Sequence, residues 1–178
     1  KPVAMIPNCA ATRHAHFVLD GSGPSLQKPP SLDDWPKIAW DVGPGARRVN
    51  LDTVTRDQIA AWKPGETLLL SGKMLTGRDA AHKRIQDIFA KGEKLPEGVD
   101  FSNRFIYYVG PVDPVRDEVV GPAGPTTATR MDKFTEMMLE KTGLLGMVGK
   151  AERGPESIAA IRSEEHTSEL QSPCNLVC

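Results

Sequence analysis

The stretches that decide the fold are YYVGP at 107–111 and GPAGPTTATRMD at 121–132. The first is aromatic and β-branched, which is typical of a strand, and the glycines and prolines that follow predict a stiff loop. Beyond the loop, Met131, Phe134 and Met138 recur at helical spacing. The sequence therefore predicts a strand, a rigid loop and a helix that begins near Thr126 or Thr127.

The start of this predicted helix has the features of an anion-binding site. The free N–H groups at a helix N-terminus attract anions. Arg130 lies one turn into the helix, where its planar guanidinium can meet a carboxylate beside those groups. An ordinary capped surface helix with a solvated arginine would show the same spacing. On the residues alone, both interpretations stay open.

A second strand-to-helix corner repeats this pattern. Residues 67–70 predict a short buried strand, residues 71–77 a loop, and Asp79 the N-cap of a helix. Arg78 would then lie at the corner. Together with Arg130 it could bind the two ends of a dicarboxylate, which is what a four-carbon diacid requires. The inward face of this helix is expected to hold Ala80, Ala81, Ile85, Ile88 and Phe89.

Two further residues near these corners have a structural and a functional interpretation. His82 lies one turn into the second helix, where a packing or hydrogen-bonding histidine is favoured over a catalytic one. Residues 144–148 predict a buried strand, so Lys150 would project just beyond its end. Ligands gather at the carboxyl ends of strands in α/β folds, although most lysines in such positions are simply solvated.

Composition narrows the class of protein. The 178 residues include 22 basic and 23 acidic ones, with a net charge of -1, which gives no electrostatic case for nucleic acid. The apolar runs are too short to span a membrane, and the amino terminus lacks a signal-peptide pattern. These features favour a soluble cytoplasmic enzyme. The chain starts at Lys1 and continues directly into the apolar residues 3–6, so we expect it to begin inside a larger domain.

The stretch at 107–132 and the motif TGRDAAH at 76–82 resemble the carboxy-terminal part of the iron-sulfur, or class I, fumarate hydratases, a family that includes tartrate dehydratases. The resemblance covers most of residues 2–161. It implies a hydro-lyase of the tricarboxylic acid cycle that hydrates fumarate reversibly to malate with a [4Fe-4S] cluster, and a homodimer in the full-length enzyme. Tartrate or another hydroxy diacid remains an alternative substrate, and a stand-alone anion-binding α/β module remains a non-enzymatic one.

The resemblance also implies roles for individual residues. Arg78, Arg130 and Lys150 match the positions that hold the substrate carboxylates, and Thr126 matches the proposed general base. A threonine hydroxyl is a weak base unaided, so it would need a partner or the field of nearby cations. The matching general acid, an aspartate, would lie upstream of Lys1.

Cys9 has two interpretations. A lone cysteine after a short apolar run is most often a buried packing residue. The segment PVAMIPNC at 2–9, however, resembles the one in which the family places a cluster ligand, so that Cys9 would bind one iron of the [4Fe-4S] cluster and two other cysteines would lie upstream. His14 and His16 share one face of a possible strand, and we interpret them as structural.

These features predict an α/β chain in three parts. Residues 1–45 would hold the end of the iron-sulfur domain and a linker, in which Trp35 and Trp40 anchor the chain to a neighbouring surface. Residues 46–161 would form an incomplete swivelling β/β/α domain. Residues 162–178 are expected to be non-native, because SEEHTSELQS at 163–172 matches a translated sequencing adapter. Cys174, Cys178 and His166 would then have no function.

Overall fold

The computed structural model describes residues 17–19, 21–26, 31–34, 43–114, 117 and 119–163. The chain divides into two compact units, residues 1–43 and 44–178. In the first unit, strands β1 (Phe17–Leu19) and β2 (Pro24–Leu26) pair antiparallel, and a 3-10 turn, η1, covers Leu32–Asp34. Five residues to which the sequence analysis gave a role in this unit lie outside the described part of the chain: Cys9, His14, His16, Trp35 and Trp40.

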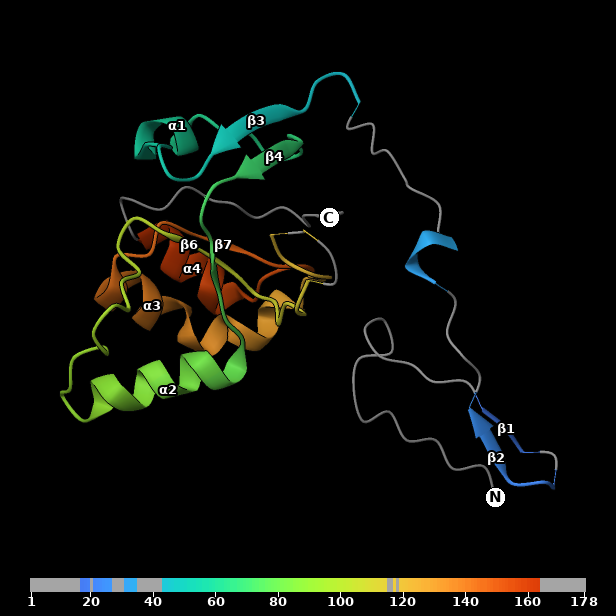
Figure 1. Cartoon of the computed structure of the whole chain (residues 1–178). Coiled ribbons are helices and arrows are strands. Elements are labelled where there is room, and N and C mark those ends of the chain that lie inside the picture. Colours follow the sequence, from blue (N-terminus) through green and yellow to red (C-terminus); the bar gives the residue numbers. More distant parts are fainter. Residues whose placement is uncertain are drawn as a thin grey trace. The chain divides into compact units, whose positions relative to one another are not determined.

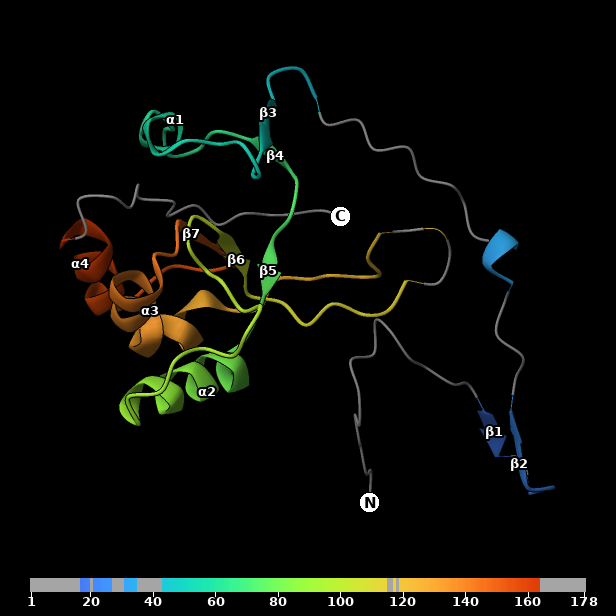
Figure 2. The ribbon, with the colours of Figure 1, turned by 60° about the vertical axis from the view of Figure 1, so that its left-hand side comes forward.

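The second unit is built in layers around a parallel sheet. This central sheet has the order β5-β6-β7, with β5 at Leu75–Thr76, β6 at Phe105–Tyr107 and β7 at Gly146–Val148. A separate parallel pair, β3 (Arg47–Asn50) and β4 (Leu68–Ser71), lies on one side of it together with the short helix α1 (Arg56–Ala60) (Figure 1). Helices α2 (Asp79–Ala90) and α3 (Thr135–Thr142) lie on the other side (Figure 2).

Two more helical elements complete this unit. The 3-10 helix η2 (Ala128–Phe134) runs directly into α3, and α4 (Pro155–Ser163) packs against both of them. None of the helices in the described ranges is long and apolar enough to cross a membrane. The mixed α/β class predicted from the sequence is confirmed. The swivelling β/β/α type and the three domain boundaries stay predictions.

Strand β6 and the residues after it bury both faces, which explains their uninterrupted apolar character. Successive side chains of a strand point to opposite sides of a sheet. Ile106 and Tyr108 therefore pack against the helices, in a cluster with Met131, Phe134, Met138 and Leu144. Phe105, Tyr107 and Val109 face the β3-β4 layer, in a second cluster with Val49, Leu51, Ile59 and Val148.

The structure corrects the sequence prediction around the corner that carries Arg78. Residues 71–77 are not all loop, because Leu75–Thr76 pair with β6 as strand β5. The preceding strand is shifted by one residue, to Leu68–Ser71, and its three leucines are only half-buried. A two-residue strand leaves no periodicity in the sequence. Only its pairing with Ile106 and Tyr107, 31 residues further along the chain, reveals it.

Helix α2 has a different N-cap from the predicted one, whereas the N-cap of the helix after the glycine- and proline-rich loop is one of the two predicted residues. The N-cap of α2 is Arg78 rather than Asp79, and it makes no side-chain capping hydrogen bond. Ala80 and Ala81 are exposed; the inward position of the first turn belongs to His82. The helix after the glycine- and proline-rich loop has the predicted Thr127 as its N-cap. It begins as the 3-10 segment η2, and Thr127 makes no side-chain capping bond. The predicted inward residues of this helix are all buried: Met131, Phe134 and Met138.

Candidate functional site

The carboxyl ends of the central strands bring two of the predicted residues to one edge of the sheet. Because β5, β6 and β7 are parallel, the segments that leave them emerge at the same edge. Arg78 lies two residues beyond β5, and Lys150 two residues beyond β7. Both are exposed. The residues that follow β6 run between them.

Thr126 is fixed at this edge by backbone hydrogen bonds on both sides. Its N–H donates to the carbonyl of Tyr108 (2.7 Å), just beyond β6, and its carbonyl accepts from the N–H of Lys150 (3.2 Å). The N–H of Ala128 in turn donates to the Lys150 carbonyl (2.8 Å), so that residues 126–128 pair in parallel with Lys150. The long loop after β6 therefore returns to the sheet and sets Thr126 beside Lys150.

Arg78 is held against the backbone that follows β6. The N–H of the preceding Gly77 donates to the Tyr107 carbonyl (3.1 Å). The guanidinium lies on Gly110, where a Cβ atom would come within 3.2 Å of the Arg78 Cζ. A side chain at position 110 would therefore press against Arg78. Within the described residues, the Arg78 guanidinium has no hydrogen-bond or ion-pair partner.

Arg130 joins the two predicted corners through an ion pair. Its guanidinium contacts the Oδ2 atom of Asp79, the first residue of α2 and the neighbour of Arg78. The side chains of Arg130 and Asp79 are 58% and 40% exposed. The other carboxylate oxygen of Asp79 is buried and has no partner among the described residues. The pair brings the start of η2 next to the start of α2.

The structure thus gathers Arg78, Thr126, Arg130 and Lys150 around one edge of the sheet. Three of the four are cationic, and one of them, Arg130, is paired with Asp79. In the described part of the chain, the side chains of Thr126 and Lys150, like that of Arg78, have no hydrogen-bond or ion-pair partner. Such an arrangement attracts an anion, and two cations from different loops suit a ligand with a carboxylate at each end.

His82 and Tyr108 lie beneath these residues in the core. His82 is 1% exposed, its Nδ1 bonds to the Arg78 carbonyl at 2.9 Å, and its ring meets the Tyr108 ring edge-on. A carbonyl only accepts, so Nδ1 carries the proton. Burial lowers the pKa of His82 and raises the pKa of Tyr108 to about 12. Both rings are uncharged at neutral pH, and His82 has the hydrogen-bonding and packing role that the sequence favoured.

Sequence reasoning missed a buried ion pair behind this edge. Nε of Arg153 donates to Oδ1 of Asp132 at 2.6 Å, and the two side chains are only 8% and 14% exposed. Asp132 belongs to the stretch that decides the fold, yet nothing was predicted for it. The available signal was its place directly after the inward-facing Met131, because a charge so close to a buried helix face needs a partner.

The described residues contain no ligand set for a metal. No group of three or more His, Cys, Asp or Glu side chains converges among them. Each cysteine of the chain, Cys9, Cys174 and Cys178, lies outside the described ranges. The ranges described here do not by themselves fit an iron-sulfur cluster.

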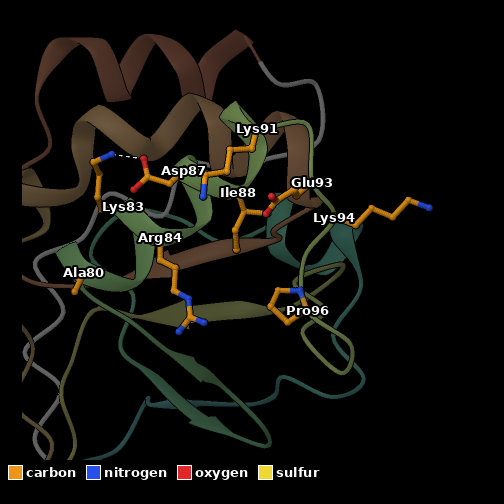
Figure 3. A pocket seen from close by; sticks show the side chains of 9 residues that line it. All are labelled: Ala80, Lys83, Arg84, Asp87, Ile88, Lys91, Glu93, Lys94 and Pro96. Carbon is orange, nitrogen blue, oxygen red and sulfur yellow. Dashed lines mark hydrogen bonds and ion pairs between the residues drawn. The ribbon is translucent and has the colours of Figure 1, made fainter.

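An open groove of about 690 Å³ lies along α2, away from the site residues (Figure 3). Arg84 and Ile88 line it from the helix and Pro96 from the loop beyond, and the Lys83–Asp87 ion pair spans one turn at its side. Neither Arg78 nor the other predicted site residues line this groove. Its charged residues are solvated surface lysines, arginine and carboxylates, so we do not assign the active site to it.

The chain was compared with known proteins. A family model described as fumarase C-terminus matches residues 21–170. Fumarate hydratase 2 of Leishmania major is 30% identical over 164 residues, which are 87% of this chain and 28% of the relative. The aerobic class I fumarate hydratase of Salmonella typhimurium is 29% identical over 162 residues, 87% of this chain and 27% of the relative. The chain spans under a third of the length of these relatives.

A second kind of relative is shorter. The beta subunit of L(+)-tartrate dehydratase from Escherichia coli is 33% identical over 114 residues, 61% of this chain and 53% of the relative. The family model covers well over half of the chain and includes every residue of the edge described above. It does not include the segment that contains Cys9. The chain belongs to the fumarase C-terminus family.

Proposed function

We propose that this chain is the carboxy-terminal part of a class I fumarate hydratase and supplies the carboxylate-binding side of a site that adds water reversibly to fumarate to give malate. The observation that carries the proposal is the convergence of Arg78, Thr126, Arg130 and Lys150 at the carboxyl ends of the central strands. The names of the relatives, fumarate hydratases among them, support the same reaction.

In this proposal the three cations divide the work of holding the diacid. Arg78 and Lys150 lie beyond strands on the two sides of β6 and have exposed side chains, so either can meet a carboxylate. Arg130 pairs with Asp79 but has five N–H donors, so it can bind a substrate carboxylate without releasing Asp79. Neutralising both carboxylates would also stabilise the extra negative charge that builds up next to one of them during hydration.

Thr126 is the proposed general base. Its hydroxyl is weakly basic by itself, so the proposal requires a nearby cation, such as Lys150, whose backbone pairs with that of Thr126, to favour loss of its proton. The proposed general acid is an aspartate from upstream of this chain. The N–H and carbonyl of Thr126 are both bonded, so the backbone that carries the hydroxyl is fixed before substrate arrives.

The proposed cofactor is a [4Fe-4S] cluster with Cys9 as one ligand. The described residues provide no ligand set of their own, so Cys9 and two upstream cysteines would have to hold the cluster. When bound, it would supply a Lewis acid for the substrate's oxygen atoms. The complete enzyme is further proposed to be a cytoplasmic homodimer.

Replacement of Arg130 tests the proposal. In the complete enzyme, assayed without oxygen, Arg130→Ala is expected to lower kcat/KM for fumarate by about a hundredfold or more, because a bidentate carboxylate contact is lost. The cluster's absorption spectrum should be unchanged. Arg84→Ala, an exposed arginine on the outer face of α2, is the matched control and should keep normal activity. Near-normal turnover in Arg130→Ala would overturn the assignment.

A second candidate reaction is the dehydration of tartrate or another hydroxy diacid. It is favoured by the similarity to a protein named as a tartrate dehydratase beta subunit. The two candidates share the carboxylate-binding residues and differ only in the hydroxyl groups of the substrate. Comparing kcat/KM for fumarate, malate and L(+)-tartrate with one enzyme preparation decides between them. Diacid binding without turnover by the cluster-loaded protein would instead support the anion-binding module.

A further inference from the structure

The buried pair of Asp132 and Arg153 lies directly behind the residues proposed to bind the substrate. Asp132 follows Arg130 by two residues on η2, and Arg153 follows Lys150 by three residues on the loop after β7. Their hydrogen bond of 2.6 Å therefore connects the element that carries one substrate cation to the segment that carries another. Both side chains are largely buried, with 8% and 14% of their surface exposed, so the pair lies mostly beneath the exposed edge.

Asp132 and Arg153 also make hydrogen bonds to other residues around them. Besides Arg153, the carboxylate of Asp132 accepts from the N–H of Gly154 (2.6 Å). The guanidinium also donates to the hydroxyls of Thr135 and Ser157, the second at 3.2 Å. Ser157 in turn donates to the Asp132 carbonyl (3.3 Å). The network joins η2 to the first residue of α3 and the first turn of α4, and a planar guanidinium with this many bonds has one orientation.

The loop that carries Lys150 has a constrained backbone. Ala151 has a φ of 67°, the left-handed conformation that an alanine rarely adopts. Such a residue persists only where its surroundings fix it on both sides. On one side, Lys150 is paired with Thr126 and Ala128 through backbone hydrogen bonds. On the other side, Arg153 is fixed by its buried ion pair.

Gly154 provides a third constraint on the same loop. A Cβ atom there would lie 2.8 Å from the Asp132 Oδ2 atom. The backbone at position 154 approaches the carboxylate so closely that a side chain would have to displace it. The bond from the Gly154 N–H to the same oxygen is short because the residue has no side chain.

We propose that Asp132 and Arg153 are positioning residues that fix the separation between Arg130 and Lys150, and thereby select a ligand with two carboxylates at a set distance. This inference rests on the proposed function of Arg130 and Lys150. An apolar contact in the same place would let η2 and the loop slide past each other. The directed hydrogen bonds between a planar fork and a carboxylate do not.

The test compares a dicarboxylate with a monocarboxylate of the same chain length. Succinate and butyrate are measured as competitive inhibitors of fumarate hydration by the complete enzyme. In Asp132→Asn, the inhibition constant of succinate is expected to rise about tenfold, because a small misplacement of one binding group is costly. That of butyrate, which needs only one cation, should stay within about twofold. A general loss of folded enzyme would lower activity without changing the ratio of the two constants.

A second variant keeps the proposal testable if Asp132→Asn fails to fold. Gly154→Ala keeps every charge and should raise the succinate constant in the same direction by displacing the Asp132 carboxylate. Asp87→Asn, which removes an exposed carboxylate of α2, is the control and should change neither constant. An unchanged succinate-to-butyrate ratio in a folded variant overturns this inference alone. A wild-type enzyme that does not bind succinate overturns the proposed function and this inference with it.

Discussion

The two arginine–aspartate pairs of η2 have the same chemistry and opposite surroundings. Arg130 and Asp79 meet at the exposed edge of the sheet, whereas Arg153 and Asp132 meet in the interior. Water screens the attraction between Arg130 and Asp79. A bound ligand that weakens their contact therefore costs little free energy. The buried pair is only 8% and 14% exposed, so little water can replace a missing partner. The difference indicates that an exposed charge near this site binds, while a buried one holds the binding groups in place.

The comparison also shows that closeness in sequence does not identify partners. Arg130 and Asp132 are separated by one residue and could be taken for a pair. Each instead pairs with a residue from another element: Arg130 with Asp79 at the start of α2, and Asp132 with Arg153 before α4. The two side chains are part of a 3-10 segment in which Met131 between them is fully buried.

The largest expected effect comes from breaking the buried pair. Arg153→Met should lower the free energy of unfolding by about 3–5 kcal/mol, because it leaves the Asp132 carboxylate buried without its cation. Urea unfolding of the chain measures the change. The double variant Arg153→Met with Asp132→Leu should recover most of this loss, since an apolar pair has no charge to desolvate. A cost below about 1 kcal/mol for the single variant would place the buried pair in the same class as exposed ones.

A second prediction concerns the pKa of His82, which is influenced by the charge of one member of each pair. Burial is the largest cause of its lowered pKa; Arg153 lowers the pKa further, and Asp79 raises it. Above a pH of about 6.5 both the folded and the unfolded chain hold the ring neutral. Below that pH the unfolded chain binds a proton and the folded chain does not. The free energy of unfolding therefore decreases as the pH is lowered, until the pKa of His82 in the folded chain is reached.

The measurement is the free energy of unfolding between pH 7 and pH 5. His82→Asn, which keeps an N–H group near the Arg78 carbonyl but cannot be protonated, should show a smaller fall than the wild type. Each unit by which the folded pKa is lowered contributes about 1.4 kcal/mol to this difference. Asp79→Asn should deepen the fall and Arg153→Met should reduce it, because they remove opposite charges from the surroundings of His82. Equal slopes in wild type and His82→Asn would contradict the prediction.

The sequence predicted the parts of the site that depend on local pattern. A strand before the glycine- and proline-rich loop, the apolar spacing of η2 and α3, and the place of Lys150 just beyond a strand follow from composition and periodicity. The structure has each of them, but β6 spans only Phe105–Tyr107, so the strand ends earlier than the predicted aromatic run. The gathering of Arg78 and Lys150 at one edge also follows, once the strands are taken as parallel.

The rest depended on contacts between distant segments, which periodicity does not contain. Strand β5 exists because Leu75 and Thr76 pair with β6. The inward position of His82 in α2 depends on its contact with Tyr108 and on the hydrogen bond to the Arg78 carbonyl. The sequence favoured a packing or hydrogen-bonding histidine at this position, but only the tertiary contacts identify its partners. The roles of the site residues and of Cys9 stay predictions.

The smallest expected effect comes from the exposed pair, and it tests the comparison most directly. Asp79→Asn should lower the free energy of unfolding by about 1 kcal/mol or less, because an exposed ion pair contributes little. Asp87→Asn breaks the exposed Lys83–Asp87 pair within α2 and should cost about 0.3–0.5 kcal/mol. The difference between these two variants estimates what Asp79 contributes through the helix N-terminus.

Salt separates the two kinds of pair. At about 1 M salt the screening length falls to about 3 Å, so the cost of Asp79→Asn should nearly vanish. The cost of Arg153→Met should persist, because salt does not enter the interior where Asp132 lies. Urea titrations of both variants in low and high salt measure this. If the cost of Asp79→Asn is large and independent of salt, the exposed pair holds Arg130 as firmly as the buried pair holds Arg153, and the contrast drawn between the two pairs is wrong.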